Sequence, residues 1–292
     1  MKYPVSVWLP YFTNLPVREA ITHLTNAGFF YGELSTEHYR ELMACGDPEI
    51  AGRTLRQYAD SVGYKVCQGH LTFHGGLCDD AAIERLKPEV DMFAAAGITK
   101  AVIHVNGGND LSPEERYERR VRYLRKLAEY VDGTGITLCV ENVHTLPECQ
   151  DAAKIKTIIK DAGGKNLGIC LDTGHLHLTR MSGQTQESFR DFILDAGDLL
   201  QALHITDNNG TEDSHQMPFS ARRGVRWQEV MLGLKEIDYK GLFNLEIIGE
   251  RYAPLAIKLE KLKYIHSMCE YMMSEEFLAL DPDSYLPPMD KR

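Results

Sequence analysis

The chain has 292 residues, 43% of them hydrophobic and 25% charged, with a formal net charge of −10 at pH 7. This composition is typical of a soluble globular protein, and the negative charge disfavours nucleic acid as a partner because phosphate backbones attract basic surfaces. No apolar run approaches the roughly 20 residues of a membrane-spanning helix, and the start MKYPVSVWLPYF does not resemble a secretory signal. The seven cysteines are scattered without a Cys-x-x-Cys pair, which favours reduced thiols in a cytoplasmic protein.

Eight short apolar segments recur along the chain and predict β-strands. They cover residues 5–9, 29–34, 64–70, 100–105, 136–141, 167–172, 201–206 and 242–248. Amphipathic stretches with helical spacing separate them. Glycines such as Gly28 and Gly97 follow several of these stretches, where a left-handed helix cap is common.

Strands that alternate with helices predict a parallel sheet, and eight such units in about 250 residues predict a single (β/α)₈ TIM barrel. A doubly wound open sheet is the alternative, but it would normally carry a glycine-rich phosphate loop after its first strand, where this chain reads LPYFTNLP. We expect the barrel to span residues 1–274. Residues 275–292, which prolines interrupt, should form a C-terminal extension across the surface or a neighbouring subunit.

Ionisable residues stand at or near the ends of six predicted strands, where the catalytic groups of a TIM barrel are found. They are His70, His104, Glu141, Asp172, His204 and Glu246. For any one buried histidine, a hydrogen-bonded place in the core is the alternative. Six such groups together cost several kcal/mol each to bury unpaired, and a divalent cation would neutralise them. The pattern therefore predicts a metal site at the C-terminal ends of the strands.

The segment LHITDNNGTEDSHQ at 203–216 opens a long loop, and loops of this length are often functional. We expect it to fold Asp213 and His215 over the site, while Asn208, Asn209 and Gly210 form a turn.

Three further residues are candidates for the pocket wall. His175 follows Asp172 by three residues at a strand-to-helix turn. Glu33 ends the second strand and Trp8 lies in the first, and for Trp8 a place in the barrel core is the alternative. His74 and His144 fit loop positions better than ligand positions.

The ordered segments ENVHT, LDTGH, LHITDNNG, GVRW and NLEI resemble the xylose isomerase-like TIM barrel superfamily, and the resemblance extends from the first strand to the eighth. This superfamily includes sugar epimerases, inosose-processing enzymes and type IV apurinic endonucleases. Its epimerases bind one divalent metal ion through a glutamate, an aspartate, a histidine and a second glutamate. The resemblance assigns these roles to Glu141, Asp172, His204 and Glu246.

The endonucleases of the superfamily use nine ligands for three zinc ions, and this chain offers a candidate for each. The candidates are His70, His104, Glu141, Asp172, His175, His204, Asp213, His215 and Glu246. Other endonuclease signatures are absent, since residues 142–145 read NVHT in place of Asn-Thr-Ala-Gly. The DNNG segment at 207–210 is more similar to the sugar isomerase branch. The chain departs from that branch's Pro-Gly-x-Gly loop at 218–224, which leaves the substrate open.

Three carboxylates and one imidazole suit Mn²⁺, Mg²⁺ or Co²⁺ better than a structural zinc, although catalytic Zn²⁺ also fits. The resemblance implies a metal-dependent sugar isomerase or epimerase in which Glu141 and Glu246 move a proton next to a carbonyl through an enediolate. His70, His104 and His175 would hold substrate hydroxyls. The alternatives are a lyase or hydratase acting on a 3-keto sugar or glycoside, an apurinic-site endonuclease with three zinc ions, and a non-catalytic metal-binding barrel. We expect a small sugar or sugar derivative as partner, with neither nucleic acid nor membrane, and a homo-oligomer stays open.

Overall fold

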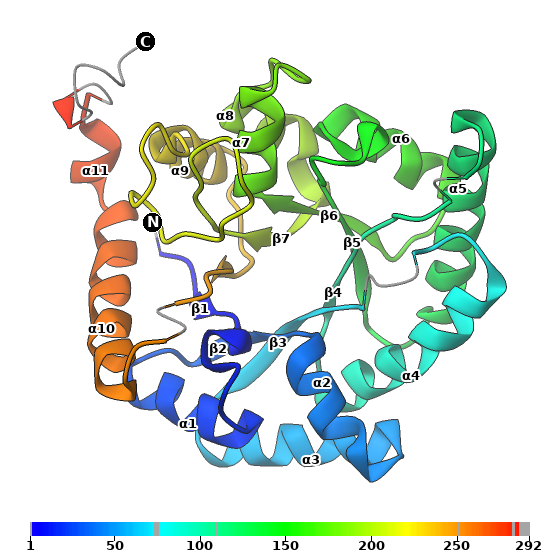
Figure 1. Ribbon diagram of the computed structural model, residues 1–292, viewed down its shortest axis with the longest axis horizontal. Coiled ribbons are helices and arrows are strands. Elements are labelled where there is room, and N and C mark those ends of the chain that lie inside the picture. Colours follow the sequence, from blue (N-terminus) through cyan, green and yellow to red (C-terminus); the bar gives the residue numbers. More distant parts are fainter. Residues whose placement is uncertain (1, 73–75, 109, 250–251, 282–283, 286–292) are drawn as a thin grey trace.

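The computed structural model describes residues 2–72, 76–108, 110–249, 252–281 and 284–285. Within these residues the chain forms eight strands that alternate with helices (Figure 1). The strands are β1 (Val5–Val7), β2 (Tyr31–Leu34), β3 (Lys65–His70), β4 (Lys100–Ile103), β5 (Thr137–Glu141), β6 (Leu167–Asp172), β7 (Leu200–His204) and β8 (Phe243–Leu245).

The strands form one parallel sheet in which each strand pairs with its neighbours in sequence and β1 also pairs with β8. The ring is completed between β7 and β8 by a parallel bridge from Ile205 to Leu245. At this junction Ile205 N donates to Asn244 O at 2.8 Å, and Glu246 N donates to Ile205 O at 3.2 Å. The prediction of a single (β/α)₈ TIM barrel is confirmed.

Helices surround the strands on the outside of the ring (Figure 1). The α-helices are α1 (Val17–Asn26), α2 (Thr36–Leu42), α3 (Pro48–Ser61), α4 (Asp80–Ala96), α5 (Pro113–Tyr130), α6 (Ala152–Ala162), α7 (Thr173–Met181), α8 (Phe189–Ala196), α9 (Trp227–Glu236), α10 (Leu255–Met272) and α11 (Glu275–Ala279). Short 3-10 helices cover Leu9–Phe12, Met43–Cys45, Pro147–Cys149 and Gly197–Leu199.

Local sequence explains where several of these helices begin. In α5, Pro113 occupies the first turn, and Ser112 and Glu115 form a capping box, which satisfies backbone N–H groups that lack partners within the helix. Asp79 caps α4 by accepting a hydrogen bond from Ala82 N at 2.7 Å. These caps fix where each helix begins after its loop.

The apolar core has two parts. The larger part fills the space between the sheet and the helices. A separate group inside the ring consists of four fully buried residues from β4 to β7, namely Val102, Cys139, Cys170 and Ala202. The chain therefore closes the barrel interior with side chains, and the functional chemistry is confined to its ends.

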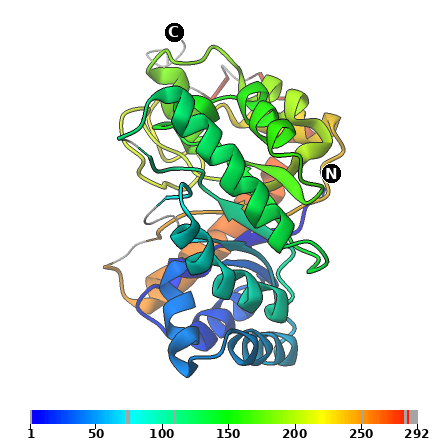
Figure 2. The ribbon, with the colours of Figure 1, turned by 90° about the vertical axis from the view of Figure 1, so that its right-hand side faces the viewer.

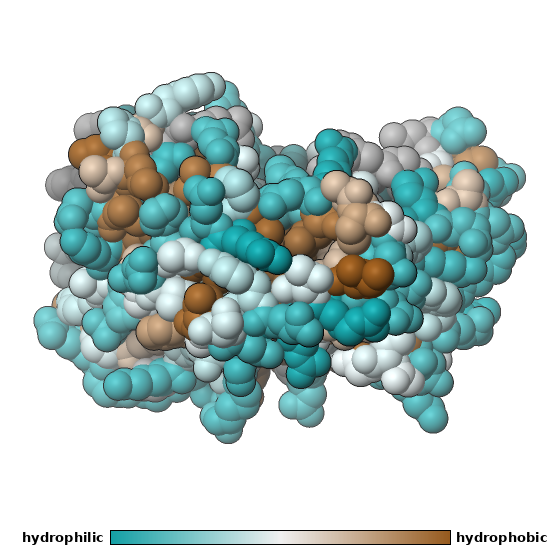
Figure 3. All heavy atoms as spheres, turned by 90° about the horizontal axis from the view of Figure 1, so that it is seen from below, coloured by the Kyte–Doolittle hydropathy of each residue, from teal (hydrophilic) through white to brown (hydrophobic). Residues whose placement is uncertain are grey.

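The described part of the C-terminal segment packs against α9. The Gln228 side chain donates to Leu280 O at 2.8 Å and accepts from Tyr285 Oη at 2.9 Å. Phe277 of α11 is buried. Among the described residues no helix is both long and apolar enough to cross a membrane. The face drawn in Figure 3 is mostly hydrophilic, with hydrophobic residues in separate small groups, which is ordinary for a protein surface.

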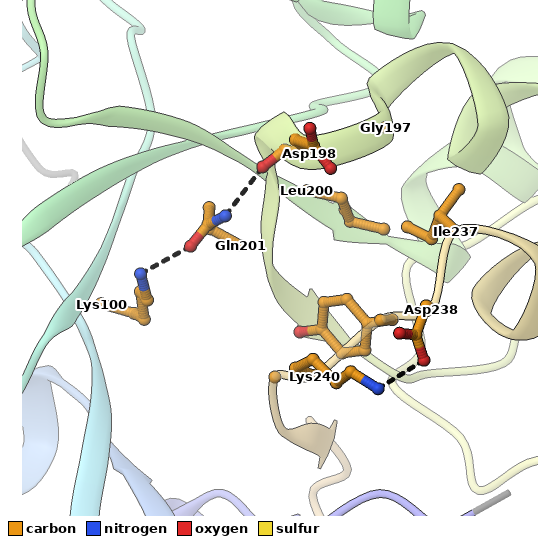
Figure 4. Close-up of a pocket in the computed structure, with 10 residues that line it drawn as sticks. Lys100, Gly197, Asp198, Leu200, Gln201, Ile237, Asp238 and Lys240 are labelled. Carbon is orange, nitrogen blue, oxygen red and sulfur yellow. Dashed lines mark hydrogen bonds and ion pairs between the residues drawn. The ribbon is translucent and has the colours of Figure 1, made fainter.

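The loops that follow β7 and β8 project from one side of the barrel (Figure 2). A hollow of about 360 Å³ lies at the opposite end, beside the starts of β4 and β7 (Figure 4). There Lys100 Nζ donates to Gln201 Oε1 at 2.6 Å, and Gln201 Nε2 donates to Asp198 O at 2.8 Å. Residues at this end of a TIM barrel serve stability rather than catalysis, so the candidate site lies at the other end.

Candidate active site

Four ionisable residues converge at the C-terminal ends of β5 to β8. Glu141, Asp172 and His204 are the last residues of β5, β6 and β7, and Glu246 directly follows β8. Each offers a ligand atom within 4.8 Å of the others. His204 Nδ1 lies 3.1 Å from Glu246 Oε2, 3.3 Å from Glu141 Oε1 and 4.0 Å from Asp172 Oδ2. The structure thus brings together the four residues that the sequence predicts as metal ligands.

The donor set fits a divalent cation. All four residues are buried, and none is more than 6% exposed. Two of their atoms, Asp172 Oδ2 and His204 Nδ1, have no hydrogen-bond partner within the described residues. A buried polar atom without a partner costs about 1–3 kcal/mol. A cation placed between three carboxylates and an imidazole would satisfy both atoms and offset the carboxylate charges.

Asp172 also begins the next helix. Its Oδ1 accepts a hydrogen bond from His175 N at 2.6 Å and caps α7, while Asn142 Oδ1 accepts from Asp172 N at 2.7 Å. The first turn of α7 thereby hydrogen-bonds to one oxygen of the Asp172 carboxylate, Oδ1. The other, Oδ2, is left for a ligand.

Burial and the neighbouring histidines have opposite effects on the pKa values of the carboxylates. Burial alone would raise the pKa of Glu141, but His104 and His204 outweigh it and hold that pKa well below its usual range. Burial would also raise the pKa of Glu246, but the nearby His204 and His215 outweigh it and lower that pKa to about 2. For Asp172, burial and the carboxylates of Glu141 and Glu246 outweigh His175 and raise the pKa to about 7.

Two predicted substrate-binding histidines flank the second oxygen of Glu141. His104 Nε2 lies 2.8 Å and His70 Nε2 lies 3.3 Å from Glu141 Oε2. Burial lowers the pKa of His104. For His70, burial would lower the pKa, but the hydrogen bond to Glu141 and the charges of Glu141 and Glu33 together outweigh it and raise the pKa. These three residues form a second group with the spacing of metal ligands.

The loop after β7 brings a third group to the same end. His175 Nε2 lies 3.1 Å from Asp213 Oδ2, and His215 Nε2 lies 3.5 Å from the same oxygen. Burial would lower the pKa of His215, but Glu246 and Asp213 raise it to about 10. His144 also joins this group, since its ring centroid is 5.1 Å from that of His175. His74 lies outside the described residues.

Trp8 lies beside this third group. Its ring is nearly parallel to that of His215 at 5.8 Å, and its Nε1 donates to Ile247 O at 2.8 Å. It is only partly buried, so its ring is available as a flat wall beside the opening.

Glu33 differs from the expectation that it lines the pocket. Its side chain has no exposed surface, and its Oε2 lies 2.9 Å from His204 Nε2, on the side of the ring away from the carboxylate cluster. The physical reason is its depth, because Glu33 occupies the layer of side chains beneath the four predicted ligands. It contacts a ligand residue from behind and does not face the opening.

Asp207 is a structural residue of the loop that sequence reasoning missed. Its carboxylate accepts hydrogen bonds from Asn208 N and Val225 N at 2.9 Å each, from Phe219 N at 3.1 Å and from Trp227 Nε1 at 3.4 Å. Its backbone pairs with that of Gln216 in both directions. An aspartate directly after the predicted strand 201–206, at the start of a long loop, marks the position in the sequence, but the sequence does not show the four donors that define its role.

The turn predicted at 208–210 is present. Asn208 Oδ1 accepts from Gly210 N at 2.9 Å, and Asn209 Oδ1 accepts from Thr211 N at 3.0 Å. Asn208 is also fully buried and donates to Gly174 O at 2.9 Å. It therefore fastens the loop to α7 as well.

Together the fold and site define a TIM barrel with a cluster of buried carboxylates and imidazoles at its catalytic end. Residues 24–268 match the family model of the xylose isomerase-like TIM barrel. The chain belongs to this family.

Among curated proteins, the chain is 27% identical over 241 residues to the D-psicose 3-epimerase of Agrobacterium fabrum, a match that covers 77% of each chain. It is 26% identical over 140 residues to the probable endonuclease 4 of Metamycoplasma arthritidis, covering 46% of this chain and 50% of that protein. Its fold is similar to a solved L-ribulose 3-epimerase, with a TM-score of 0.75 at 16% identity, covering 98% of this chain and all of the other.

Proposed function

We propose that the protein is a divalent-metal-dependent sugar isomerase or epimerase that moves a proton bound to carbon next to a carbonyl. The observation that carries the proposal is the convergence of Glu141, Asp172, His204 and Glu246 on one point, with two ligand atoms that lack hydrogen bonds to any residue that the structure describes. The similarity to a D-psicose 3-epimerase over 77% of each chain supports the sugar substrate.

An ion held by these four residues would supply Lewis-acid stabilisation of negative charge on the substrate oxygens. Mn²⁺ is the ion we expect first, with Mg²⁺, Co²⁺ and Zn²⁺ as further candidates. The remaining chemistry belongs to side chains of the chain itself.

Glu141 and Glu246 are the proposed acid and base. Their low pKa values keep both carboxylates ionised at neutral pH, so either can accept a proton from carbon, and the other group returns one after taking it from solvent or a neighbour. His70, His104 and His175 lie within reach of Glu141 and would orient substrate hydroxyls. Asp213 and His215 would do so from the loop, and Trp8 would pack against the sugar ring.

Proton movement at carbon is tested by turnover in D₂O. The metal-loaded protein is incubated with a panel of ketoses and 3-keto-glycosides, and deuterium beside the carbonyl is read by NMR and mass spectrometry. Glu141→Gln and Glu246→Gln keep the side-chain shape but remove the base, so each should reduce exchange by roughly 10²–10⁴-fold. Metal content is measured alongside. Glu148→Gln serves as the control, because the Glu148 carboxylate pairs with Arg120 at 2.7 Å and lies outside the cluster. Exchange that survives both substitutions with metal still bound contradicts the proposal.

An apurinic-site endonuclease is the second candidate, and a specific observation favours it. The groups formed by His70 with His104 and by His175 with Asp213 adjoin the central cluster, as a centre with three ions requires. Cleavage of an abasic duplex, with three bound zinc ions and no deuterium entering any sugar of the panel, would establish this candidate in place of the first.

A further inference from the structure

Glu33 makes an unusual set of contacts for a fully buried carboxylate. Its Oε2 accepts hydrogen bonds from three side chains, His204 Nε2 at 2.9 Å, Asn244 Nδ2 at 3.2 Å and the amide of Gln68. Its Oε1 has no hydrogen-bond partner in the described part of the chain. All hydrogen bonding of this carboxylate is therefore concentrated on the one oxygen that faces His204.

The two amides are themselves held in one orientation. Ser6 Oγ donates to Asn244 Oδ1 at 2.8 Å, which leaves Asn244 Nδ2 to point at Glu33. Gln68 Nε2 also reaches Leu203 O at 3.4 Å. Residues from β1, β2, β3 and β8 thus fix the carboxylate beneath the end of β7, so its position does not depend on a flexible side chain.

The two nitrogens of His204 face different partners. Nε2 faces Glu33, whereas Nδ1 faces the oxygens of Glu141 and Glu246 and has no hydrogen-bond partner among the described residues. A ring nitrogen that hydrogen-bonds to a carboxylate must carry the proton, which leaves the lone pair of the neutral ring on Nδ1. The ring is therefore oriented to present a metal-binding atom to the cluster.

We propose that Glu33 is a positioning residue for metal binding, which holds His204 so that Nδ1 is the ligand atom and Nε2 carries the proton. Carboxylates behind metal-ligating histidines fix the ring and increase its basicity. This inference rests on the proposed metal site, although it does not depend on which sugar reacts there.

The substitution Glu33→Gln separates positioning from a purely structural role. A glutamine can place its oxygen where Oε2 lies and keep all three hydrogen bonds, and its NH₂ then occupies the place of Oε1, which has no partner among the residues described. Only the negative charge is lost. Glu89→Gln is the matched control, because Glu89 of α4 is also a buried carboxylate. It accepts a hydrogen bond from Thr72 N at 2.8 Å and does not belong to the four-residue cluster.

Mn²⁺ affinity is measured by calorimetry for the wild-type protein and both variants, with folding checked by circular dichroism. We expect Glu33→Gln to weaken Mn²⁺ binding about 10–100-fold and Glu89→Gln to leave it unchanged. In the His204→Ala background, Glu33→Gln should have no further effect, because Glu33 acts through that ring. Independent effects of the two substitutions, or an unchanged affinity in folded Glu33→Gln, would overturn the inference.

Nitrogen-15 NMR of the protein with labelled histidines provides a second readout, with the signals of His204 assigned by its alanine variant. With Zn²⁺ bound, we expect His204 to be ligated at Nδ1 and protonated at Nε2, and ligation at Nε2 would overturn the inference. Deuterium exchange is measured on the same samples. Wild-type protein that binds Mn²⁺ without catalysing exchange argues against the proposed function alone, whereas Glu33→Gln that keeps both argues against the role of Glu33 alone.

Discussion

Replacing Asp207 with alanine tests how the loop that carries Asp213 and His215 is held. The Asp207 carboxylate accepts four hydrogen bonds, and two of the donors are backbone N–H groups of the buried residues Asn208 and Val225. The alanine variant leaves these two groups without an acceptor. At about 1–3 kcal/mol for each buried unsatisfied donor, the loss is about 2–6 kcal/mol before any compensation.

The alanine variant also removes the free-energy cost of burying the charged carboxylate, and this gain depends on pH. Burial is the largest influence on Asp207 and outweighs its hydrogen bonds, raising the pKa from 3.8 to about 6. Because the folded-state pKa is raised, the contribution of Asp207 to the free energy of unfolding is complete below pH 3.8 and is lost as the pH rises through about 6. Between pH 5 and pH 8 the loss amounts to about 1.4 kcal/mol, most of it below pH 6. Asp207→Ala should therefore destabilise the protein less at pH 8 than at pH 5, by about that amount.

Urea unfolding of the metal-free protein at pH 5, 6, 7 and 8 measures the difference between the wild type and Asp207→Ala. Asp60→Ala, which removes an exposed carboxylate of α3, provides the baseline. Limited proteolysis should show new cleavage within 207–226 in the Asp207 variant alone. A destabilisation that grows with pH, or does not vary with it, would refute the reasoning.

Two further predictions concern the metal. Mn²⁺ affinity should fall at least tenfold for each pH unit below about 7, because Asp172, whose pKa burial raises to about 7, must lose its proton to bind, and His204, whose pKa is also raised, must lose one as well. Calorimetry between pH 5.5 and 8 checks this, and an affinity that does not change with pH would contradict it. His215→Ala should leave one bound ion per chain by elemental analysis if the four-residue cluster is the only metal site, whereas a three-ion centre would lose an equivalent.

The order of elements could be predicted from sequence because each strand and helix has its own apolar periodicity. The ends of strands were harder to predict. The apolar run 242–248 suggests a strand of that length, but β8 is Phe243–Leu245. Ile247 remains buried without belonging to the strand. Hydrophobic pattern reports burial, whereas strand length depends on pairing with neighbours that the local sequence does not show.

The convergence of Glu141, Asp172 and His204 could also be predicted, because barrel topology brings the ends of parallel strands together whatever the details of packing. The position of Glu33 could not. The pairing of β2 with β3 shifts register between Gly32 and Glu33, and such an irregularity changes which way the following side chain points. The role of Asp207 could not be predicted either, because it depends on four hydrogen-bond donors up to twenty residues away.

The metal-free cluster balances its own charge with protons. His175, His204 and His215 all have raised pKa values because each lies beside carboxylates, and these carboxylates include Glu141 and Glu246, whose pKa values are lowered in return. A cation entering the site takes over the role of these protons, so binding must release them. The number of protons released therefore depends on how many histidines become ligands. One ion held by the four-residue cluster involves only His204, whereas three ions would involve all three histidines, which makes proton release a measure of the metal count that does not require a known substrate.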